Sequence, residues 1–274
     1  MSYDIQEADE DSGTSASDQD PRSAYVSAFG RGLAVIRCFS QSQPTLTIAE
    51  VARAAGLNRA TARRFLHTLE TDGYATSENG RYRLRPTILE LGYTYLSTMS
   101  VDQVFQSELH ELAEKLHESC SAGVLDGHDV VFVARAQTSF PRIMTLALSV
   151  GTRIPAYLTA LGRVLLAELS DEELDEYLAT TPLQRETDRT ITDPDQLREV
   201  IADVRERGCC IMDQEIEVGI CALAVPVRQP NRPTMAISVA AHASRTSIES
   251  MEQGYLPALR ATGAEIERIL RLRN

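Results

Sequence analysis

One segment near the N-terminus constrains the fold most, because consecutive local signals there define two short helices. Thr47 and Glu50 have the spacing of a capping box, in which the hydroxyl caps a helix start and the carboxylate reaches back to the first amide. Gly56 stands where that helix needs a left-handed residue to end, and Asn58 is a good N-cap for a second helix over 59–72. Two helices joined by such a tight turn form the helix-turn-helix arrangement.

A β-hairpin is predicted directly after the second helix. Asn79-Gly80 is the strongest short signal for a hairpin, because both residues of such a turn must adopt positive φ. Strands expected over 74–77 and 81–85 flank it, and alternation along the second strand places its arginines on a single face. A further helix is expected over 29–41, ahead of the pair. These elements together predict a winged helix-turn-helix whose wing has a basic face.

The charge distribution supports this interpretation, although the chain as a whole carries a net charge of −12. Residues 1–20 hold seven acidic residues and no base, whereas residues 23–86 hold nine arginines against four acidic residues. Residues 87–274 are acidic again, with 17 basic against 28 acidic residues. A basic segment inside an acidic protein is typical of local phosphate binding.

Composition also divides the chain into parts. Residues 1–22 are rich in Asp, Ser, Gly and Gln and poor in apolar residues, so a disordered acidic tail is expected there. Residues 23–86 would form the winged domain. The helix expected over 87–101 has apolar residues on all sides, which predicts a linker buried on two sides, as at a dimer contact or a domain joint. A larger domain would occupy 102–274.

The larger domain has the pattern of an α+β fold. Strand-like runs lie near both of its ends with helical patterns between them, which implies a single sheet covered by helices. Helices are expected over 102–119, 158–169, 171–179, 195–207 and 248–270, and strands over 123–125, 130–134, 143–150, 221–227 and 234–241.

The sequence carries no motif of the common enzymes or metal sites. It has no G-x-S-x-G elbow, no Walker loop and no G-x-G-x-x-G. His110 and Glu111 begin a pattern like H-E-x-x-H, but Glu114 stands where the second histidine is needed. The five cysteines form no C-x-x-C pair, and their odd number argues against a disulfide framework. We therefore expect no catalytic residue, no metal and no cofactor.

The location of the protein follows from what the sequence lacks. No run of about 18 apolar residues could span a membrane. The N-terminus lacks the basic start and apolar core of a signal peptide. A cytoplasmic protein is expected.

A series of short blocks matches, in order, those of a known protein family. These blocks are Arg31-Gly32-Leu33-Ala34-Val35-Ile36, Ala62-Arg63-Arg64-Phe65-Leu66, Leu84-Arg85-Pro86, Leu91-Gly92-Tyr93, His117-Glu118-Ser119-Cys120, Arg142-Ile143-Met144-Thr145, Val150-Gly151-Thr152-Arg153, Pro155-Ala156-Tyr157, Asp213-Gln214-Glu215 and Ala241-His242-Ala243-Ser244-Arg245. On these blocks the chain resembles the IclR-type regulators, and within them the PcaR, PcaU and PobR subgroup, which controls the β-ketoadipate pathway.

The resemblance implies a ligand-responsive, sequence-specific regulator of aromatic-acid catabolism. Its larger domain would be GAF-like, binding an effector and taking part in oligomerisation. The partners implied are an operator in double-stranded DNA, a small organic acid, and further copies of the chain in a homodimer or a dimer of dimers. Protocatechuate, 4-hydroxybenzoate and β-ketoadipate are candidate effectors.

Candidate DNA contacts lie on the second helix and the wing. Arginines can pair bidentately with guanine or hold phosphates, while an amide or hydroxyl can bond a phosphate or a base edge. Wing arginines would lie beside phosphates or in the minor groove. The alternative is a solvated basic face. The candidates are Thr47, Asn58, Arg59, Ala60, Thr61, Arg63, Arg64, Arg81 and Arg83.

Candidate effector contacts come largely from the resemblance. An organic acid needs a cation for its carboxylate, for which Arg135 and Arg142 are candidates, unless they are surface charges at strand ends. Asp213 and Glu215 would bond a ligand hydroxyl or orient an arginine, and Cys221 either lines the pocket or is a core thiol. The remaining family positions are Met144, Thr145, Gly151, Ala156, Tyr157, Thr159, Ala160, Ala222, Ser238 and Ala240.

Three alternatives stay open on the sequence alone. The chain could be an enzyme carrying a DNA-binding domain, which turnover of a candidate effector would reveal. It could regulate another catabolic pathway, because sensor domains of this family accept varied ligands. The winged domain could also be a protein-interaction module, which absence of salt-dependent binding to DNA would favour.

Overall fold

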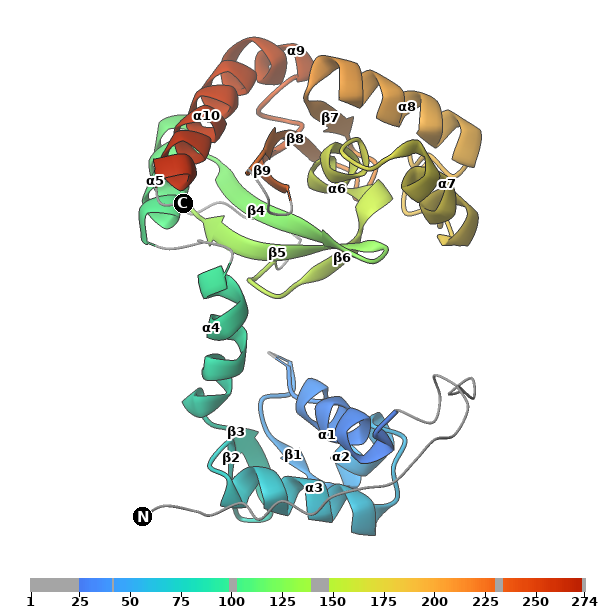
Figure 1. Ribbon diagram of the computed structural model, residues 1–274, viewed down its shortest axis with the longest axis vertical. Coiled ribbons are helices and arrows are strands. Elements are labelled where there is room, and N and C mark those ends of the chain that lie inside the picture. The colour runs from blue at the N-terminus through green and yellow to red at the C-terminus, as the bar shows by residue number, and fades with distance from the viewer. Residues whose placement is uncertain (1–24, 41, 99–102, 139–147, 230–233, 273–274) are drawn as a thin grey trace, which may run out of the picture. The chain divides into compact units, whose positions relative to one another are not determined.

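The computed structural model describes residues 25–40, 42–98, 103–138, 148–229 and 234–272. They belong to two compact units, which divide between Gly92 and Tyr93 (Figure 1).

The first unit is a three-helix domain with a small antiparallel sheet in the order β1-β3-β2. Its core is formed by Val35, Val51, Leu66 and their apolar neighbours. The expected winged helix-turn-helix is confirmed. Its elements are α1 (Ser27–Arg37), β1 (Leu46–Thr47), α2 (Ile48–Ala54), α3 (Arg59–Thr71), β2 (Ala75–Glu78) and β3 (Arg81–Leu84).

The local signals in this unit act as expected. The capping box of α2 is complete, with both the Thr47 hydroxyl and the Glu50 carboxylate in place. The Asn58 side chain accepts a hydrogen bond of 2.8 Å from the amide of the third residue of α3. Gly56 ends α2 at φ 65°, and Asn79 and Gly80 turn the hairpin at φ 51° and 76°. The strand β1 was not expected, because its two residues are strand only through pairing with β3.

A 3-10 turn over Pro86–Ile88 leads into α4 (Leu89–Thr98). Four of its large apolar residues are exposed in the single chain, from 49% for Tyr95 to 71% for Leu89 and Tyr93. Burial of this helix on two sides therefore stays a prediction that requires a further surface.

The larger unit is one six-stranded antiparallel sheet with helices on both faces, and the α+β prediction is confirmed. The strand order is β6-β5-β4-β9-β8-β7, so β4 from the start of the unit pairs with β9 from its end. The elements are α5 (Gln103–Leu116), β4 (Ser119–Asp126), β5 (Asp129–Ala136), β6 (Arg153–Pro155), η2 (Ala156–Leu158), α6 (Ala160–Leu166), α7 (Asp171–Thr180), α8 (Pro194–Arg207), β7 (Cys210–Asp213), β8 (Ile220–Val227), β9 (Met235–His242), α9 (Ile248–Ser250), η3 (Met251–Tyr255) and α10 (Leu256–Leu272).

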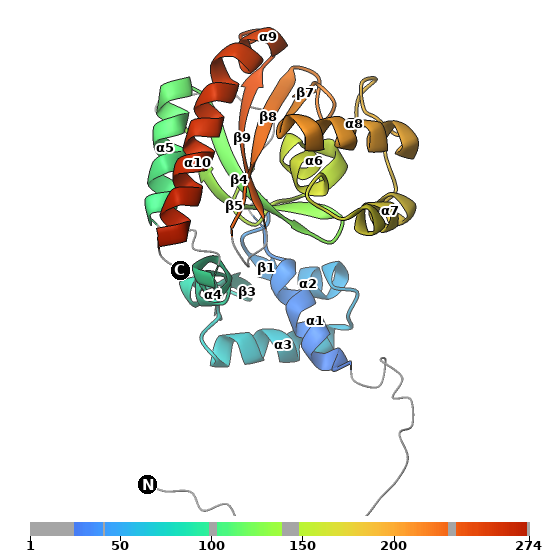
Figure 2. The same ribbon diagram turned by 45° about the horizontal axis from the view of Figure 1, so that its top comes forward.

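Each face of this sheet has its own core. The helices α5 and α10 lie side by side over one face, while α6 covers the other and lies between the sheet and α8 (Figure 2). The first core fills the space between the sheet and the pair α5 and α10, and it contains Leu109, Leu223 and Leu259.

The second core joins α6 to the opposite face of the sheet. Leu161 and Val164 of α6 pack there with Ala236 of β9, and residues of α7 and α8 extend this core away from the sheet. The α6 side of the sheet is therefore enclosed by helices, and a cavity remains within it.

Three expectations for this unit differ from the structure. Of the strand expected over 143–150, residues 143–147 lie outside the described residues, and 148–150 are not strand but lead into a turn at Gly151. The helix expected over 158–169 starts later, because the Thr159 hydroxyl caps α6 by accepting from the Gly162 amide. The last helix is interrupted near its start by the π-helical turn η3.

Candidate nucleic-acid interface and effector pocket

The helix α3 separates an apolar face from a basic one. Ala62 and Leu66 are fully buried in the core of the first unit, whereas Arg59, Arg63 and Arg64 point to its exposed side. Within the described residues, these three guanidinium groups make no ion pair and no side-chain hydrogen bond. Their donors are therefore available to a ligand.

A surface hollow brings these arginines together with the start of α2 and the tip of the wing. Five of the predicted DNA-contacting residues line it: Thr47, Arg59, Ala60, Arg63 and Arg64. Its other lining residues are Ile48, Ala49 and Gly80.

The other predicted DNA contacts lie in different surroundings. Asn58 caps α3, and its side-chain oxygen accepts from the Thr61 amide. Arg83 is exposed on β3, and its guanidinium forms no ion pair with a described residue. Arg81 is engaged within the domain, because it donates to Thr45 and lies 3.5 Å from a Glu50 oxygen.

The larger unit contains a cavity of about 60 Å³ on the α6 face of its sheet. That volume accommodates several water molecules, since about 10–15 Å³ is needed for one. Most of the wall is apolar, and its polar members are two serines, a threonine and a glutamate. The lining residues are Ser121, Phe132, Leu148, Ile154, Leu158, Thr159, Ala160, Leu161, Met212, Glu215, Ile216, Ile220, Ala222, Ser238 and Ala240.

The predicted effector residues divide into three groups. One group lines the cavity: Thr159, Ala160, Glu215, Ala222, Ser238 and Ala240. A second group lies elsewhere in the unit: Arg135, Gly151, Ala156, Tyr157, Asp213 and Cys221. The third lies outside the described residues: Arg142, Met144 and Thr145.

Arg135 belongs to the cavity's face of the sheet although it is not part of the wall. It lies directly opposite Ser121 in the β4–β5 ladder, and Ser121 lies opposite Ser238 in the β4–β9 ladder. Residues paired in this way share one face, so an arginine and two hydroxyls form a row there. One terminal nitrogen of Arg135 donates to the Leu148 carbonyl at 2.7 Å, while its buried Nε has no hydrogen-bond partner among the described residues.

Burial lowers the pKa of the Arg135 guanidinium. No carboxylate among the described residues forms an ion pair with it. A partly buried cation of this kind favours an anion that could enter the cavity from the solvent.

Glu215 forms a buried ion pair with Arg163, a residue that the sequence did not single out. Arg163 Nη1 donates to Oε1 at 2.8 Å and Nη2 to Oε2 at 2.5 Å, with 2% and 11% of the two side chains exposed. Arg163 Nε donates to the Tyr157 carbonyl at 2.9 Å. Orienting an arginine was one of the two roles predicted for Glu215, but which arginine could not be inferred because 52 residues separate the pair.

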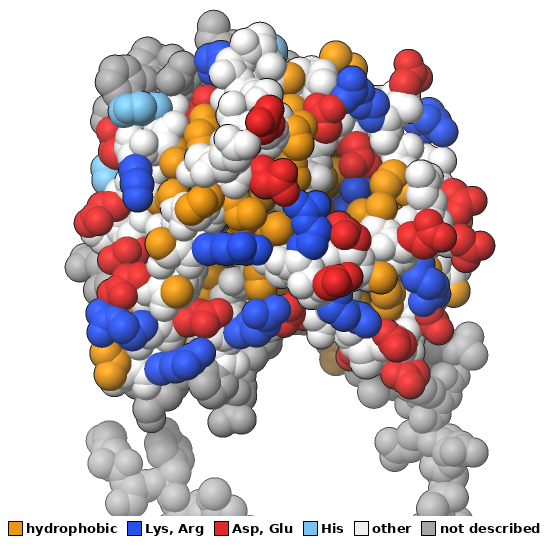
Figure 3. Space-filling model, turned by 90° about the horizontal axis from the view of Figure 1, so that it is seen from above, with side chains coloured by type: hydrophobic (Ala, Val, Ile, Leu, Met, Phe, Trp, Pro, Cys, Tyr) orange, Lys and Arg blue, Asp and Glu red, His pale blue; other side chains and the backbone are white. Residues whose placement is uncertain are grey.

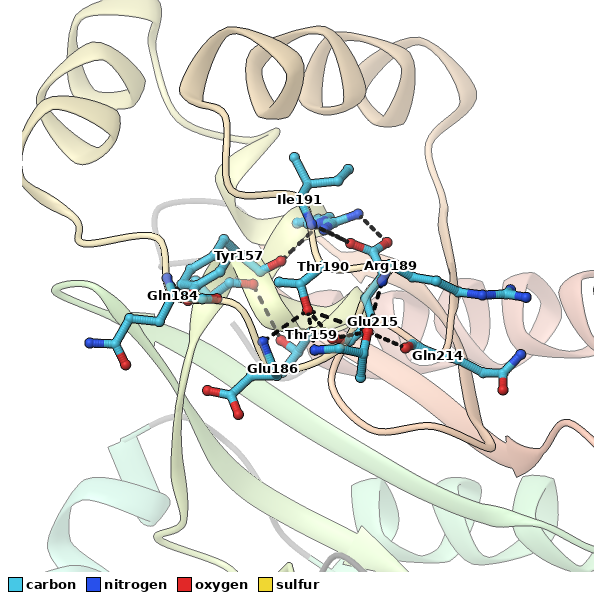
Figure 4. Close-up of polar contacts among 12 residues, drawn as sticks. Tyr157, Thr159, Gln184, Glu186, Arg189, Thr190, Ile191, Gln214 and Glu215 are labelled. Carbon is cyan, nitrogen blue, oxygen red and sulfur yellow. Dashed lines mark hydrogen bonds and ion pairs between the residues drawn. The ribbon is translucent and has the colours of Figure 1, made fainter.

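The loop between α7 and α8 is joined to this ion pair by hydrogen bonds (Figure 4). The Thr190 hydroxyl donates to the Glu215 carbonyl at 2.7 Å, and the Ile191 amide donates to Glu215 Oε2 at 3.4 Å. The Tyr157 hydroxyl both donates to the Gln184 carbonyl and accepts from its amide. The hydroxyl of Tyr157 is thus committed to the loop, and its side chain is 1% exposed.

Asp213 forms an exposed ion pair with Arg189, with 39% and 56% of the two side chains exposed. A hydrogen bond from the Gln214 side chain is the main cause that lowers the pKa of Asp213. The Cys221 thiol donates to Asp213 Oδ1 at 3.3 Å, and burial followed by this contact raises its pKa to about 11. Cys221 is 1% exposed and does not line the cavity, so its thiol lies in the core of the unit.

Three other kinds of contact would need a charged surface, a metal site or a membrane span. Basic and acidic side chains are interspersed over the face of the larger unit shown in Figure 3. Among the exposed arginines of this unit, Arg207 pairs with Glu252 and Arg205 with Asp171. The described residues contain no group of His, Cys, Asp and Glu that could hold a metal ion. None of the described helices is both long and apolar enough to cross a bilayer.

Each of the two units matches the model of a known protein family. Residues 28–78 match the model of the IclR helix-turn-helix domain. Residues 93–268 match the model of the bacterial transcriptional regulator IclR C-terminal domain.

Individual proteins are similar over most of the chain. The "Pca regulon regulatory protein" of Pseudomonas putida is 39% identical over 243 residues, covering 88% of this chain and 83% of its own. The crystal structure of a putative transcriptional regulator from Rhodococcus sp. RHA1 has a TM-score of 0.81 at 47% identity, covering 91% of this chain and 100% of its own.

A third similarity concerns the larger unit. A double mutant of the PobR transcription factor inducer binding domain from Acinetobacter was solved as a complex with 3-hydroxy benzoic acid. It has a TM-score of 0.57 at 33% identity, and it covers 60% of this chain and 96% of its own.

Proposed function

The chain belongs to the IclR family of bacterial transcriptional regulators, and from that membership we propose that it controls genes of aromatic-acid catabolism in response to an aromatic acid. The observation that carries the proposal is the cavity in the larger unit, where apolar walls share a sheet face with a partly buried arginine that no described carboxylate pairs with. One relative is named as the regulatory protein of a Pca regulon, and a double mutant of the PobR inducer binding domain forms a complex with 3-hydroxy benzoic acid, which agrees with that chemistry.

The duplex would contact the hollow of the first unit. The second helix of a helix-turn-helix enters the major groove with its N-terminal residues at the base edges. Arg59, Arg63 and Arg64 lie on that part of α3, where no described residue occupies their donors. We assign these residues to base and phosphate contacts, and the exposed Arg83 to a phosphate beside the wing.

The effector's carboxylate would bind to the row formed by Arg135, Ser121 and Ser238. A charge-assisted hydrogen bond to the Nε of Arg135 removes an unsatisfied buried donor. The apolar walls formed by Phe132, Leu158 and their neighbours suit the faces of an aromatic ring.

Glu215 would accept a hydrogen bond from a ring hydroxyl. A carboxylate has about four lone-pair positions. Three donors already occupy Glu215, two from Arg163 and one from the Ile191 amide, which leaves one position for a ligand. The pairing with Arg163 keeps this end of the cavity close to neutral, so the carboxylate of the effector is directed to Arg135.

Ligand binding would act by shifting populations. A homodimer or dimer of dimers places two or more winged domains on one operator, and the effector favours one of their arrangements. The exposed apolar residues of α4 provide a surface for such an assembly. The protein would work in the cytoplasm, where its operator lies, and would release the effector chemically unchanged.

Calorimetry tests the effector site. We expect the purified protein to bind 4-hydroxybenzoate or 3,4-dihydroxybenzoate more tightly than benzoate, since a polar partner lost from a ligand leaves Glu215 unsatisfied. Arg135→Ala should weaken all three acids by about tenfold or more, the loss of one charge-assisted hydrogen bond. Arg268→Ala, which removes an exposed arginine of α10, is the matched control and should change nothing.

Two results would count against this proposal. Unchanged affinity of Arg135→Ala for every acid would remove the anion site. Conversion of the acid during incubation, detected by chromatography, would favour an enzyme carrying a DNA-binding domain.

A further inference from the structure

The basic segment of the first unit contains four acidic residues, and two of them hold the wing. Glu50 on α2 contacts Arg81 on β3, and Glu70 on α3 contacts Ser77 on β2. The wing is thereby attached to both helices of the helix-turn-helix through side chains.

The Arg81 guanidinium contacts three oxygen atoms, two of Thr45 and one of Glu50. Its Nε donates to the Thr45 hydroxyl at 3.2 Å, and its Nη2 donates to the Thr45 carbonyl at 2.8 Å. The same Nη2 lies 3.5 Å from Glu50 Oε2. That oxygen also accepts from the Thr47 amide at 2.7 Å and the Thr47 hydroxyl at 2.9 Å, so Arg81 binds to the capping box of α2.

The backbone pairing beneath these contacts is short. The strand β1 pairs with β3 only through Leu46 with Tyr82 and Thr47 with Arg81. The contacts of Arg81 with Thr45 extend this attachment by one residue. On the other side, Glu70 Oε1 accepts from the Ser77 amide at 3.1 Å and its hydroxyl at 2.6 Å.

We propose that Arg81 is a positioning residue, which fixes the wing against α2 and does not serve as a phosphate ligand. The inference rests on the proposed contact between the first unit and duplex DNA. Glu50 offsets the charge of Arg81, so the pair adds no net positive charge to the face. A single exposed ion pair stabilises little, but here two further hydrogen bonds fix the same guanidinium.

Arg83 provides the comparison on the same strand. It is exposed like Arg81, and no acidic residue of the described chain pairs with it. Removing a phosphate-contacting arginine reduces the slope of log affinity against log salt by about 0.9. The two wing arginines should therefore differ in the salt dependence that their loss produces.

The test uses the full chain and an operator duplex that the wild-type protein selects from a random-sequence pool. The double variant Arg81→Ala/Glu50→Gln removes the ion pair at constant net charge, and its glutamine can still complete a capping box. We expect its affinity, measured by fluorescence anisotropy over a salt series, to fall about tenfold with the wild-type slope. Arg83→Ala should lose affinity together with about 0.9 of the slope.

Each other outcome has a definite meaning. A slope reduced in the double variant as in Arg83→Ala would show that Arg81 holds a phosphate, and unchanged affinity would show that it does nothing for the wing; both overturn the inference. If the wild-type protein bound no duplex at all, the proposed function itself would fail. Thermal melting of each variant verifies that the domain is folded.

A second variant keeps the inference testable if the double variant does not fold. Arg81→Lys preserves the charge but loses the planar fork that contacts both Thr45 and Glu50. We expect weaker operator binding with an unchanged salt slope. Full wild-type affinity in Arg81→Lys would show that only the charge matters, and would overturn the inference.

Discussion

The buried pair of Arg163 and Glu215 shows how much one residue depends on another in this protein. Both charges are withdrawn from solvent, and within the described residues the hydrogen bonds that Arg163 donates are accepted by Glu215 and by the Tyr157 carbonyl. Removing one partner of such a pair leaves the other charge buried without compensation, whereas replacing both by apolar residues of similar size is often neutral.

We therefore expect Arg163→Met to destabilise the larger unit by about 3–5 kcal/mol. The double variant Arg163→Met/Glu215→Leu should recover most of that loss, and urea unfolding measures both. Additive losses in the double variant would contradict this account.

In the double variant Arg163→Met/Glu215→Leu, the preference for hydroxylated acids over benzoate should disappear while benzoate still binds.

The cysteines give a second prediction at the scale of single residues. Burial raises the pKa of Cys120 and Cys210 to about 12, and that of Cys221 to about 11. Because the thiolate is the reactive form, these thiols should resist Ellman's reagent at a mildly alkaline pH in the native protein and react after unfolding. Cys38 is only partly buried and should react first. Rapid reaction of native Cys221, identified by mass spectrometry, would contradict the buried placement.

At the scale of elements, α4 carries two apolar stripes on opposite sides. Leu89 and Tyr93 are four residues apart and share one side, while Leu91 and Tyr95 share the other. All four are exposed in the single chain, between 49% and 71%. Two such stripes on one helix are typical of an element that packs against two different surfaces.

The variant Leu89→Glu/Tyr93→Glu tests whether α4 takes part in assembly. We expect it to lower the dimer fraction in sedimentation velocity, because carboxylates would be buried without partners. Leu272→Glu makes the same change at a residue of α10 that is 74% exposed, and it should leave the assembly intact. Equal dimer fractions in all three proteins would exclude this stripe from the interface.

Elements defined by neighbouring residues could be predicted from the sequence. The caps at Thr47 and Asn58 and the turn at Asn79 depend on residues no more than a few positions away. The short strands β1 and β6 could not be predicted, because they are strands only through partners far along the chain.

The residues of the candidate site were also predicted only in part. The family blocks and positions included Thr159, Glu215 and Ser238, which line the cavity. Sequence reasoning missed Arg163 and Ser121, because a buried ion pair and a position in a sheet ladder depend on the folded register. A lone arginine inside the apolar run of α6 was the one available signal for Arg163, since a charge there needs a buried partner.

At the scale of the whole molecule, the regulator should couple its two ligands. If the effector changes operator affinity by some factor, the operator must change effector affinity by the same factor, and such factors are commonly about 5–150-fold. Calorimetry with and without operator duplex measures one side of the cycle, and anisotropy with and without effector measures the other. A factor of one would mean that the acid occupies the cavity without regulating DNA binding.

The pairing of β4 with β9 has a consequence for synthesis of the protein. These two strands form the middle of the sheet, yet Ser119 and its partner Ala240 are far apart in the sequence, one near the start of the larger unit and the other toward its end. A ribosome therefore completes the winged domain long before the sensor's sheet can close. A premature stop codon after the first unit would leave a winged domain that lacks the larger unit and the end of α4. Such nonsense alleles should therefore give a product that no longer responds to the metabolite and that assembles poorly on an operator.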